Sequence, residues 1–94
     1  MYAVIRRYEG VTEPAEAGRL VNEEFLPLVR QVQGFVAYYW VDAGDGVMVS
    51  TSVFQDRSGA EESTHRAKDF VRDRLAALLP QPPQVTAGEV VAAS

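Results

Sequence analysis

Residues 35–54 decide the fold, and they read FVAYYWVDAGDGVMVSTSVF. Two runs rich in aromatic and β-branched residues, Phe35–Val41 and Val47–Phe54, lie on either side of Ala43-Gly44-Asp45-Gly46. Aromatic and β-branched residues favour strands, and a short segment of Gly and Asp favours a tight turn. The stretch therefore predicts an antiparallel β-hairpin.

Both faces of the first run are apolar or aromatic. Successive side chains of a strand point to opposite faces. One face would carry Phe35, Ala37, Tyr39 and Val41, and the other would carry Val36, Tyr38 and Trp40. A sheet face that contacts only water is normally polar, so we expect something to cover each face of this hairpin.

Upstream of the hairpin, residues 2–8 combine β-branched and aromatic residues and stop at Glu9-Gly10, which predicts a first strand. Thr12 is the expected N-cap of the helix that follows. Pro27 supplies no N–H to the carbonyl of Glu23, so we expect this helix to kink or split near Leu26. Up to Gly34, its apolar residues recur at helical spacing: Ala17, Val21, Phe25, Leu28 and Val32.

Downstream, Ser58-Gly59-Ala60-Glu61 fits a capping box and predicts the start of a second helix. Pro80, Pro82 and Pro83 would end this helix, and residues 84–92 are expected to form the last strand. The side chains predicted to share one face of the helix are Ala60, Ser63, Ala67, Phe70, Val71, Arg74, Leu75 and Leu78.

The resulting order is β-α-β-β-α-β in a single domain of residues 1–94. This order is typical of the ferredoxin-like α+β fold, a four-stranded antiparallel sheet with two helices on one face. The chain then has no element left to cover the second face. A second copy with two-fold symmetry is the economical cover, so we expect a homodimer.

The composition excludes several classes of function. The formal net charge is −4, and the basic residues are mixed among acidic ones, which argues against a nucleic-acid partner. The absence of cysteine rules out disulfides and thiolate chemistry, and a single histidine favours neither a metal site nor a cofactor. No apolar run has the length of a signal sequence or a membrane span, which predicts a cytoplasmic protein without a membrane partner.

Short motifs at the ends of the second and third predicted strands are similar to those of a known protein family. Gly34-Phe35 leads into the second strand, and Phe54-x-Asp56-x-Ser58 follows the third. Together with the βαββαβ order and the two-sided strands, these motifs resemble the dimeric α+β barrel superfamily, and within it the antibiotic biosynthesis monooxygenase group. Enzymes of that group are typically cofactor-free oxygenases of phenolic or polyketide-like substrates. The resemblance implies a small-molecule-binding homodimer, either a cofactor-independent monooxygenase or a non-catalytic ligand-binding or structural dimer.

The chain also departs from the pattern of its relatives. Members of the group often carry Ser-x-Glu-Ala, with a histidine seven residues after the serine. Ser58 and His65 match that spacing, but Ala60 stands where the glutamate would be. The haem-degrading branch uses an asparagine on the first strand and a tryptophan just after the third. This chain has arginines in the first place and Phe54-Gln55 in the second, which disfavours haem degradation.

His65 is the first candidate for a catalytic residue, because its ordinary pKa lies near neutrality. On a helix, however, His65 lies roughly 160° from Ala67, near the centre of the apolar stripe. Its neighbours one turn away are Glu61 and Asp69, both suited to solvent. This geometry favours a surface histidine, and a catalytic role would need another element to enclose it.

Tyr38, Tyr39 and Trp40 are the candidates for binding an aromatic small molecule. Planar ligands stack on such side chains in partly apolar pockets. Packing in the core or between subunits is the alternative. Because neighbours alternate faces, Tyr39 is not expected to share a pocket wall with Tyr38 and Trp40.

Three polar residues complete the candidate site. Glu24 lies about 60° from Val21, at the margin of the apolar stripe of the first helix. If partly buried, Glu24 would have a raised pKa and serve as a general base; otherwise it would reach solvent. Asn22 could orient a ligand oxygen from the flank of the same helix. One of Arg6 and Arg7 must point into an apolar face and needs a partner, which could be Glu24, Glu89 or a substrate anion. Arg6 is the candidate for binding substrate.

Overall fold

The strands and helices follow the expected order in the computed structural model, which describes all of residues 1–94. The strands are β1 (Tyr2–Tyr8), β2 (Phe35–Gly44), β3 (Val47–Phe54) and β4 (Gln84–Glu89). The first helical segment joins α1 (Pro14–Leu20), the π-helical turn η1 (Val21–Phe25) and α2 (Leu26–Val29). The second joins α3 (Arg57–Phe70) and the π-helical turn η2 (Val71–Leu75).

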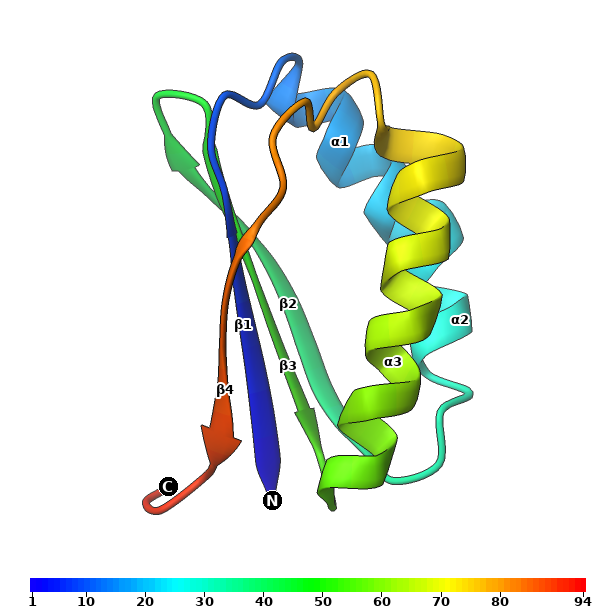
Figure 1. Ribbon diagram of the computed structural model, residues 1–94, viewed down its shortest axis with the longest axis vertical. Coiled ribbons are helices and arrows are strands. Elements are labelled where there is room, and N and C mark those ends of the chain that lie inside the picture. The colour runs from blue at the N-terminus through cyan, green and yellow to red at the C-terminus, as the bar shows by residue number, and fades with distance from the viewer.

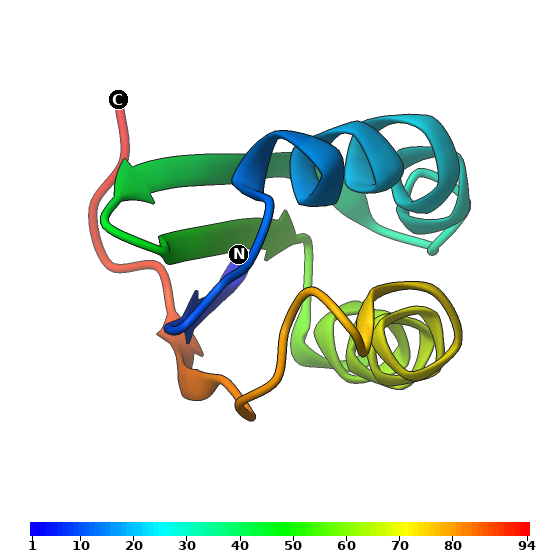
Figure 2. The same ribbon diagram turned by 90° about the horizontal axis from the view of Figure 1, so that it is seen from above.

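The four strands form one antiparallel sheet in the order β2-β3-β1-β4. Both helical segments lie side by side on one face of this sheet, and the other face is bare (Figures 1 and 2). The predicted ferredoxin-like α+β fold is confirmed. No helix is both long and apolar enough to cross a membrane.

The hairpin of β2 and β3 turns at Asp45-Gly46, and both residues have positive φ, 54° and 76°. A positive φ at both central residues defines the type I′ turn that suits a twisted hairpin. The strict alternation predicted for β2 is wrong at its start, because a bulge interrupts the register between Phe35 and Ala37. The extra residue turns Phe35 onto the helix-covered face, where its ring meets Phe54 at a centroid distance of 6.0 Å.

The first helical segment splits close to the expected place. The N–H of Leu26 reaches back five residues to the carbonyl of Val21, which makes η1 a π-helical turn just before Pro27. The predicted cap is wrong: the helix begins at Pro14, after Glu13, whose φ is 52°. The hydroxyl of Thr12 donates instead to the carbonyl of Ala77, 3.4 Å away.

The N-cap of the second helix is Asp56, two residues before the predicted cap Ser58. The Asp56 carboxylate accepts hydrogen bonds from the Gly59 N–H (3.1 Å) and the Ser58 hydroxyl (2.8 Å). These bonds lower the pKa of Asp56, because they favour its charged form. The predicted capping box is therefore wrong, and Glu61 instead pairs with Arg57 at 3.0 Å. The end of the last strand also differs, because β4 stops at Glu89, opposite Tyr2, where β1 begins.

The core lies between the sheet and the helices, and its largest fully buried side chain is Phe54. The bare face of the sheet remains largely apolar. On β2, the exposed fractions of Tyr39 and Val41 are 64% and 48%. The other side chains on this face from β1 and β3 include Ala3, Ile5, Val49, Thr51 and Val53.

Candidate functional site

A small cavity lies between the sheet and the helices. Its volume is about 20 Å³, room for about one water molecule. Aromatic rings form much of its wall: Tyr8, Tyr38 and Trp40 from the sheet, and Phe25 and Phe70 from the helices. The other residues that line it are Arg6, Val21, Val29, Ser50, Ser52, Ser63, Ala67, Val71 and Leu75.

A wider groove adjoins this cavity on the side of β4 and α3. The groove has a volume of about 450 Å³, within the range of about 300–1,000 Å³ that is usual for small-molecule sites. Cavity and groove share four lining residues, namely Arg6, Tyr8, Ala67 and Val71. The groove is completed by Thr64, Lys68, Arg72, Pro83 and Val85.

The aromatic rings of the cavity pack against one another. The ring centroids of Tyr8 and Trp40 are 5.5 Å apart, and those of Phe25 and Tyr38 are 5.4 Å apart. The Nε1 atom of Trp40 is buried, and no protein atom accepts its hydrogen bond. A buried donor left in this state costs about 1–3 kcal/mol, so an acceptor that reaches this N–H would stabilise the protein.

The two tyrosines of the cavity are neutral at physiological pH. Burial raises the pKa of Tyr38 far above its ordinary value, and the nearby phenol of Tyr8 adds to this effect. Burial also raises the pKa of Tyr8, although the positive charge of Arg6 opposes the shift. Both hydroxyls therefore keep their protons and can donate hydrogen bonds.

Arg6 lies on the covered face of β1, between Val4 and Tyr8, and only 6% of its surface is exposed. Its Nη2 atom donates to the hydroxyl of Thr64 at 2.6 Å. That hydroxyl in turn donates to the carbonyl of Ala60 at 3.0 Å. Of the two strand arginines, it is therefore Arg6 that points into the apolar face.

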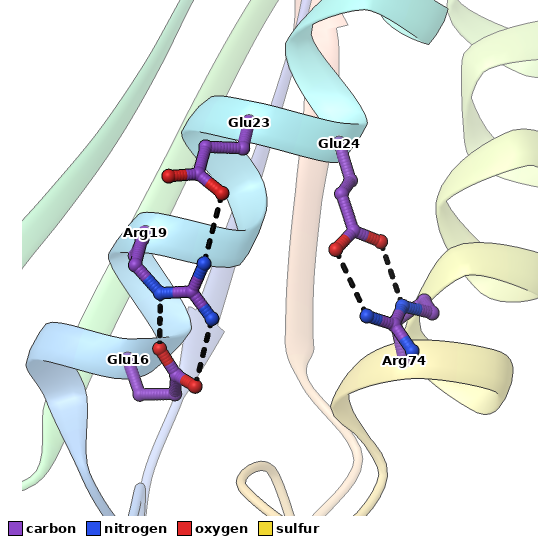
Figure 3. Close-up of polar contacts among 5 residues, drawn as sticks. All are labelled: Glu16, Arg19, Glu23, Glu24 and Arg74. Carbon is purple, nitrogen blue, oxygen red and sulfur yellow. Dashed lines mark hydrogen bonds and ion pairs between the residues drawn. The ribbon is translucent and has the colours of Figure 1, made fainter.

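His65 lies on the exposed side of α3, outside both the cavity and the groove. Its catalytic role stays a prediction. Glu24 also lies outside them, in a surface hollow between the two helical segments. Its carboxylate accepts two hydrogen bonds from Arg74, at 2.6 and 2.9 Å (Figure 3).

This ion pair lowers the pKa of Glu24, because the hydrogen bonds from Arg74 favour the charged carboxylate. A general base needs a raised pKa, so this shift is opposite to the one that the predicted role of Glu24 requires. Beside it, Arg19 binds both Glu16 and Glu23 (Figure 3). These carboxylates form a charged, exposed surface of the first helical segment.

Asn22 and Tyr39 line a second surface groove, of about 270 Å³, at the junction of the first helical segment and β2. The structure therefore brings three of the predicted residues, Arg6, Tyr38 and Trp40, together in the cavity. Asn22 and Tyr39 lie in a neighbouring groove that also touches Tyr38 and Trp40.

Sequence reasoning missed Tyr8 and the hydroxyls of Ser50, Ser52 and Ser63. The alternation of side chains along the strands could have predicted the position of most of these residues. Tyr8 follows Arg6 by two residues, so both side chains share a face. Ser50 and Ser52 alternate with Val49, Thr51 and Val53 on β3, which marks an unusual pair of polar residues on the covered face.

Comparisons with known proteins give similarity in structure alone. No protein-family model matches the chain, and no curated protein matches it either. A protein of unknown function from Nitrosomonas europaea superposes with a TM-score of 0.84 at 22% identity, over 99% of this chain and 91% of that one.

Two further solved structures are monooxygenases by description. The ActVA-Orf6 monooxygenase of Streptomyces coelicolor, solved with the ligand nanaomycin D, has a TM-score of 0.78 at 18% identity, over 99% of this chain and 89% of that one. An antibiotic biosynthesis monooxygenase has a TM-score of 0.72 at 20% identity, over 98% of this chain and 100% of that one. These similarities show that the chain has the ferredoxin-like fold of antibiotic biosynthesis monooxygenases, as its resemblance to that group implied.

Proposed function

We propose that this protein is a homodimer that binds an aromatic small molecule in the cavity and groove between its sheet and α3. The observation that carries the proposal is the cavity wall, where the rings of Tyr8, Tyr38 and Trp40 come together and the buried indole N–H of Trp40 has no partner. Apolar walls with a few convergent polar groups are typical of ligand sites. The small cavity takes only part of such a ligand, and the adjoining groove holds the rest.

The homodimer is supported by the bare face of the sheet. A monomer would leave Tyr39, Val41, Ile5 and their neighbours on β3 facing water. Contiguous apolar patches of this kind usually mark an interface. A two-fold axis would bring the same face of a second copy against this one and cover both patches.

The activity that we propose for this site is oxygenation of a phenolic or polyketide-like substrate without a cofactor. A methylene group between electron-rich rings would become a carbonyl. One oxygen of dioxygen forms that C=O bond, and the other leaves as water with the two hydrogens of the methylene. The four electrons of its C–H bonds reduce dioxygen. The hydroxyls of Tyr8 and Tyr38, which stay protonated, would donate hydrogen bonds to a phenolate oxygen.

A non-catalytic ligand-binding dimer is the second candidate. It is favoured by the lining residues themselves, since no histidine, aspartate or glutamate lines either the cavity or the groove. Oxygen uptake distinguishes the two functions. A catalytic protein consumes dioxygen with an anthrone-type substrate, and a chelator leaves the rate unchanged. A protein that binds such a compound without accelerating its oxidation belongs to the second class.

Binding itself is tested by fluorescence, because Trp40 is the only tryptophan. We expect a planar phenol from a panel of hydroxynaphthalenes and anthrones to quench Trp40 saturably. Tyr38→Phe should weaken this binding by ~0.5–1.5 kcal/mol, the net contribution of one hydrogen bond, and leave the melting temperature almost unchanged. Tyr39→Phe, a control on the opposite face of β2, should leave binding unchanged. The proposal fails if no compound quenches Trp40.

Trp40→Phe gives a second, independent prediction about the cavity. The smaller ring loses packing, which lowers the free energy of unfolding by about 1–3 kcal/mol. The change also removes a buried donor without a partner, which raises the free energy of unfolding by a similar amount. We therefore expect the free energy of unfolding to stay within about 1 kcal/mol of wild type. Urea denaturation measures it. A loss of about 3 kcal/mol or more would contradict this balance between lost packing and the removed donor.

A further inference from the structure

We propose that the ligand of this site carries a carboxylate, and that Arg6 binds this group where the cavity meets the groove. The inference rests on the proposed function, because it names the chemical class of the ligand for the same site. It is carried by three observations: a buried guanidinium without a carboxylate partner, a groove whose charged lining residues are all cations, and aromatic rings beside both.

Arg6 differs from the other seven arginines of the chain. Six of them pair with an aspartate or glutamate, and all six lie on the surface: Arg7, Arg19, Arg57, Arg66, Arg72 and Arg74. Arg30 has no ion pair, but it is exposed to water. Arg6 alone combines burial with the lack of an anionic partner, since its hydrogen bond goes to the neutral hydroxyl of Thr64.

A charge removed from water is unfavourable unless an opposite charge or several hydrogen bonds compensate it. The hydroxyl of Thr64 supplies one acceptor and no negative charge. A guanidinium has five N–H donors arranged in a fork, which matches the two oxygens of a carboxylate. A guanidinium that has one neutral partner and lines an open groove is therefore able to receive an anion.

The charged side chains that line the groove beside Arg6 are positive, as Arg6 itself is. Its lining contains Arg6, Lys68 and Arg72 and no acidic residue, in a chain that has 13 acidic residues and 9 basic ones. Thr64, Lys68 and Arg72 follow one another at intervals of four residues along α3 and η2, so their side chains share one side of the helix. Although Arg72 also pairs with Asp69 and Asp73, Lys68 has no ion pair. A groove lined by one sign of charge attracts ligands of the other sign.

The position of Arg6 also fixes how the ligand lies. Arg6 and Tyr8 line both the cavity and the groove, so a carboxylate on Arg6 sits at their junction. The groove would then hold its aromatic body against the ring of Tyr8, whose centroid lies 5.5 Å from that of Trp40. The ligand class is therefore a planar aromatic carboxylic acid.

A pair of matched probes tests this inference. 2-Naphthoate and 2-naphthamide have nearly the same shape, but only the first is an anion. By titration calorimetry at low salt, we expect the wild type to bind naphthoate about 10–100-fold more tightly than the amide, as charge-assisted hydrogen bonds to a buried arginine allow. The preference should shrink as salt is added.

Arg6→Gln should abolish this preference, so that naphthoate and naphthamide bind within about threefold of each other. Arg6→Lys keeps the charge but loses the fork, and an intermediate preference is expected. Arg19→Gln, which removes one positive charge far from the groove, should leave the preference of the wild type intact. Because Arg6→Gln removes an uncompensated buried charge, its melting temperature should equal or exceed that of the wild type. If Arg6→Gln does not fold, the intermediate preference of Arg6→Lys decides the outcome.

The outcomes separate this inference from the function on which it rests. Equal binding of both probes to the wild type, or an undiminished preference in Arg6→Gln, overturns the assignment of Arg6 and leaves the aromatic site standing. If neither probe binds and no phenol quenches Trp40, the proposed function fails, and this inference fails with it.

Discussion

Phe54→Ala is expected to lower the free energy of unfolding by about 3–5 kcal/mol, the usual loss when a fully buried phenylalanine is truncated. Phe54 has an exposed fraction of 0% and packs against Phe35 across the hairpin. It also closes the core beneath α3, where a Cβ atom added to Gly59 would lie 3.3 Å from the Cβ of Phe54. Its truncation would therefore leave a cavity between Phe35 and α3.

Urea denaturation at a fixed protein concentration measures this loss, because dissociation of a dimer would add to it. Val91→Ala is the matched control, since Val91 is 94% exposed and should change stability by less than about 0.5 kcal/mol. A loss of under about 1 kcal/mol for Phe54→Ala would contradict this description of the core.

The second large effect concerns oligomeric state. In size exclusion with light scattering, the wild type is expected at twice the chain mass of 10.3 kDa, and Tyr39→Asp at 10.3 kDa. Tyr39 is 64% exposed in one chain, so the monomer loses little packing by this change. A two-fold interface, however, would bury two new carboxylates without partners, and burying an unpaired charge is strongly unfavourable.

Val91→Asp introduces the same charge outside the sheet and should leave the dimer intact. Circular dichroism should show that Tyr39→Asp remains folded. A wild-type protein that is folded and monomeric at micromolar concentration would refute the homodimer.

Most of the fold could be predicted because strands and helices leave periodic patterns in the sequence. β1 and β3 have the predicted bounds, and the split before Pro27 follows from its missing N–H. The predictions were wrong where a local interaction interrupts the regular pattern of a helix or strand. Asp56 caps α3 in place of Ser58, and the bulge after Phe35 moves that side chain to the opposite face of β2 from the one that alternation predicts. Neither a bulge nor the choice between two nearby cap residues has a reliable signature in one sequence.

The candidate site was less predictable, because its residues come from elements far apart in the chain. Alternation placed Tyr38 and Trp40 on one face and required a partner for a strand arginine. It could not bring Thr64 of α3 to Arg6, a contact that spans 58 residues. Similarly, the position of Glu24 at the edge of a helix gave no indication of Arg74, which lies 50 residues away and reverses the expected shift of its pKa.

A crystal structure of the protein with a compound that quenches Trp40 tests the central claim most directly. We predict that the ligand lies between β1 and α3, with its ring against Tyr8 and a polar atom within hydrogen-bonding distance of the indole Nε1 or of Arg6. A ligand bound in the groove of Asn22 and Tyr39, or between the bare faces of two sheets, would contradict the proposed site.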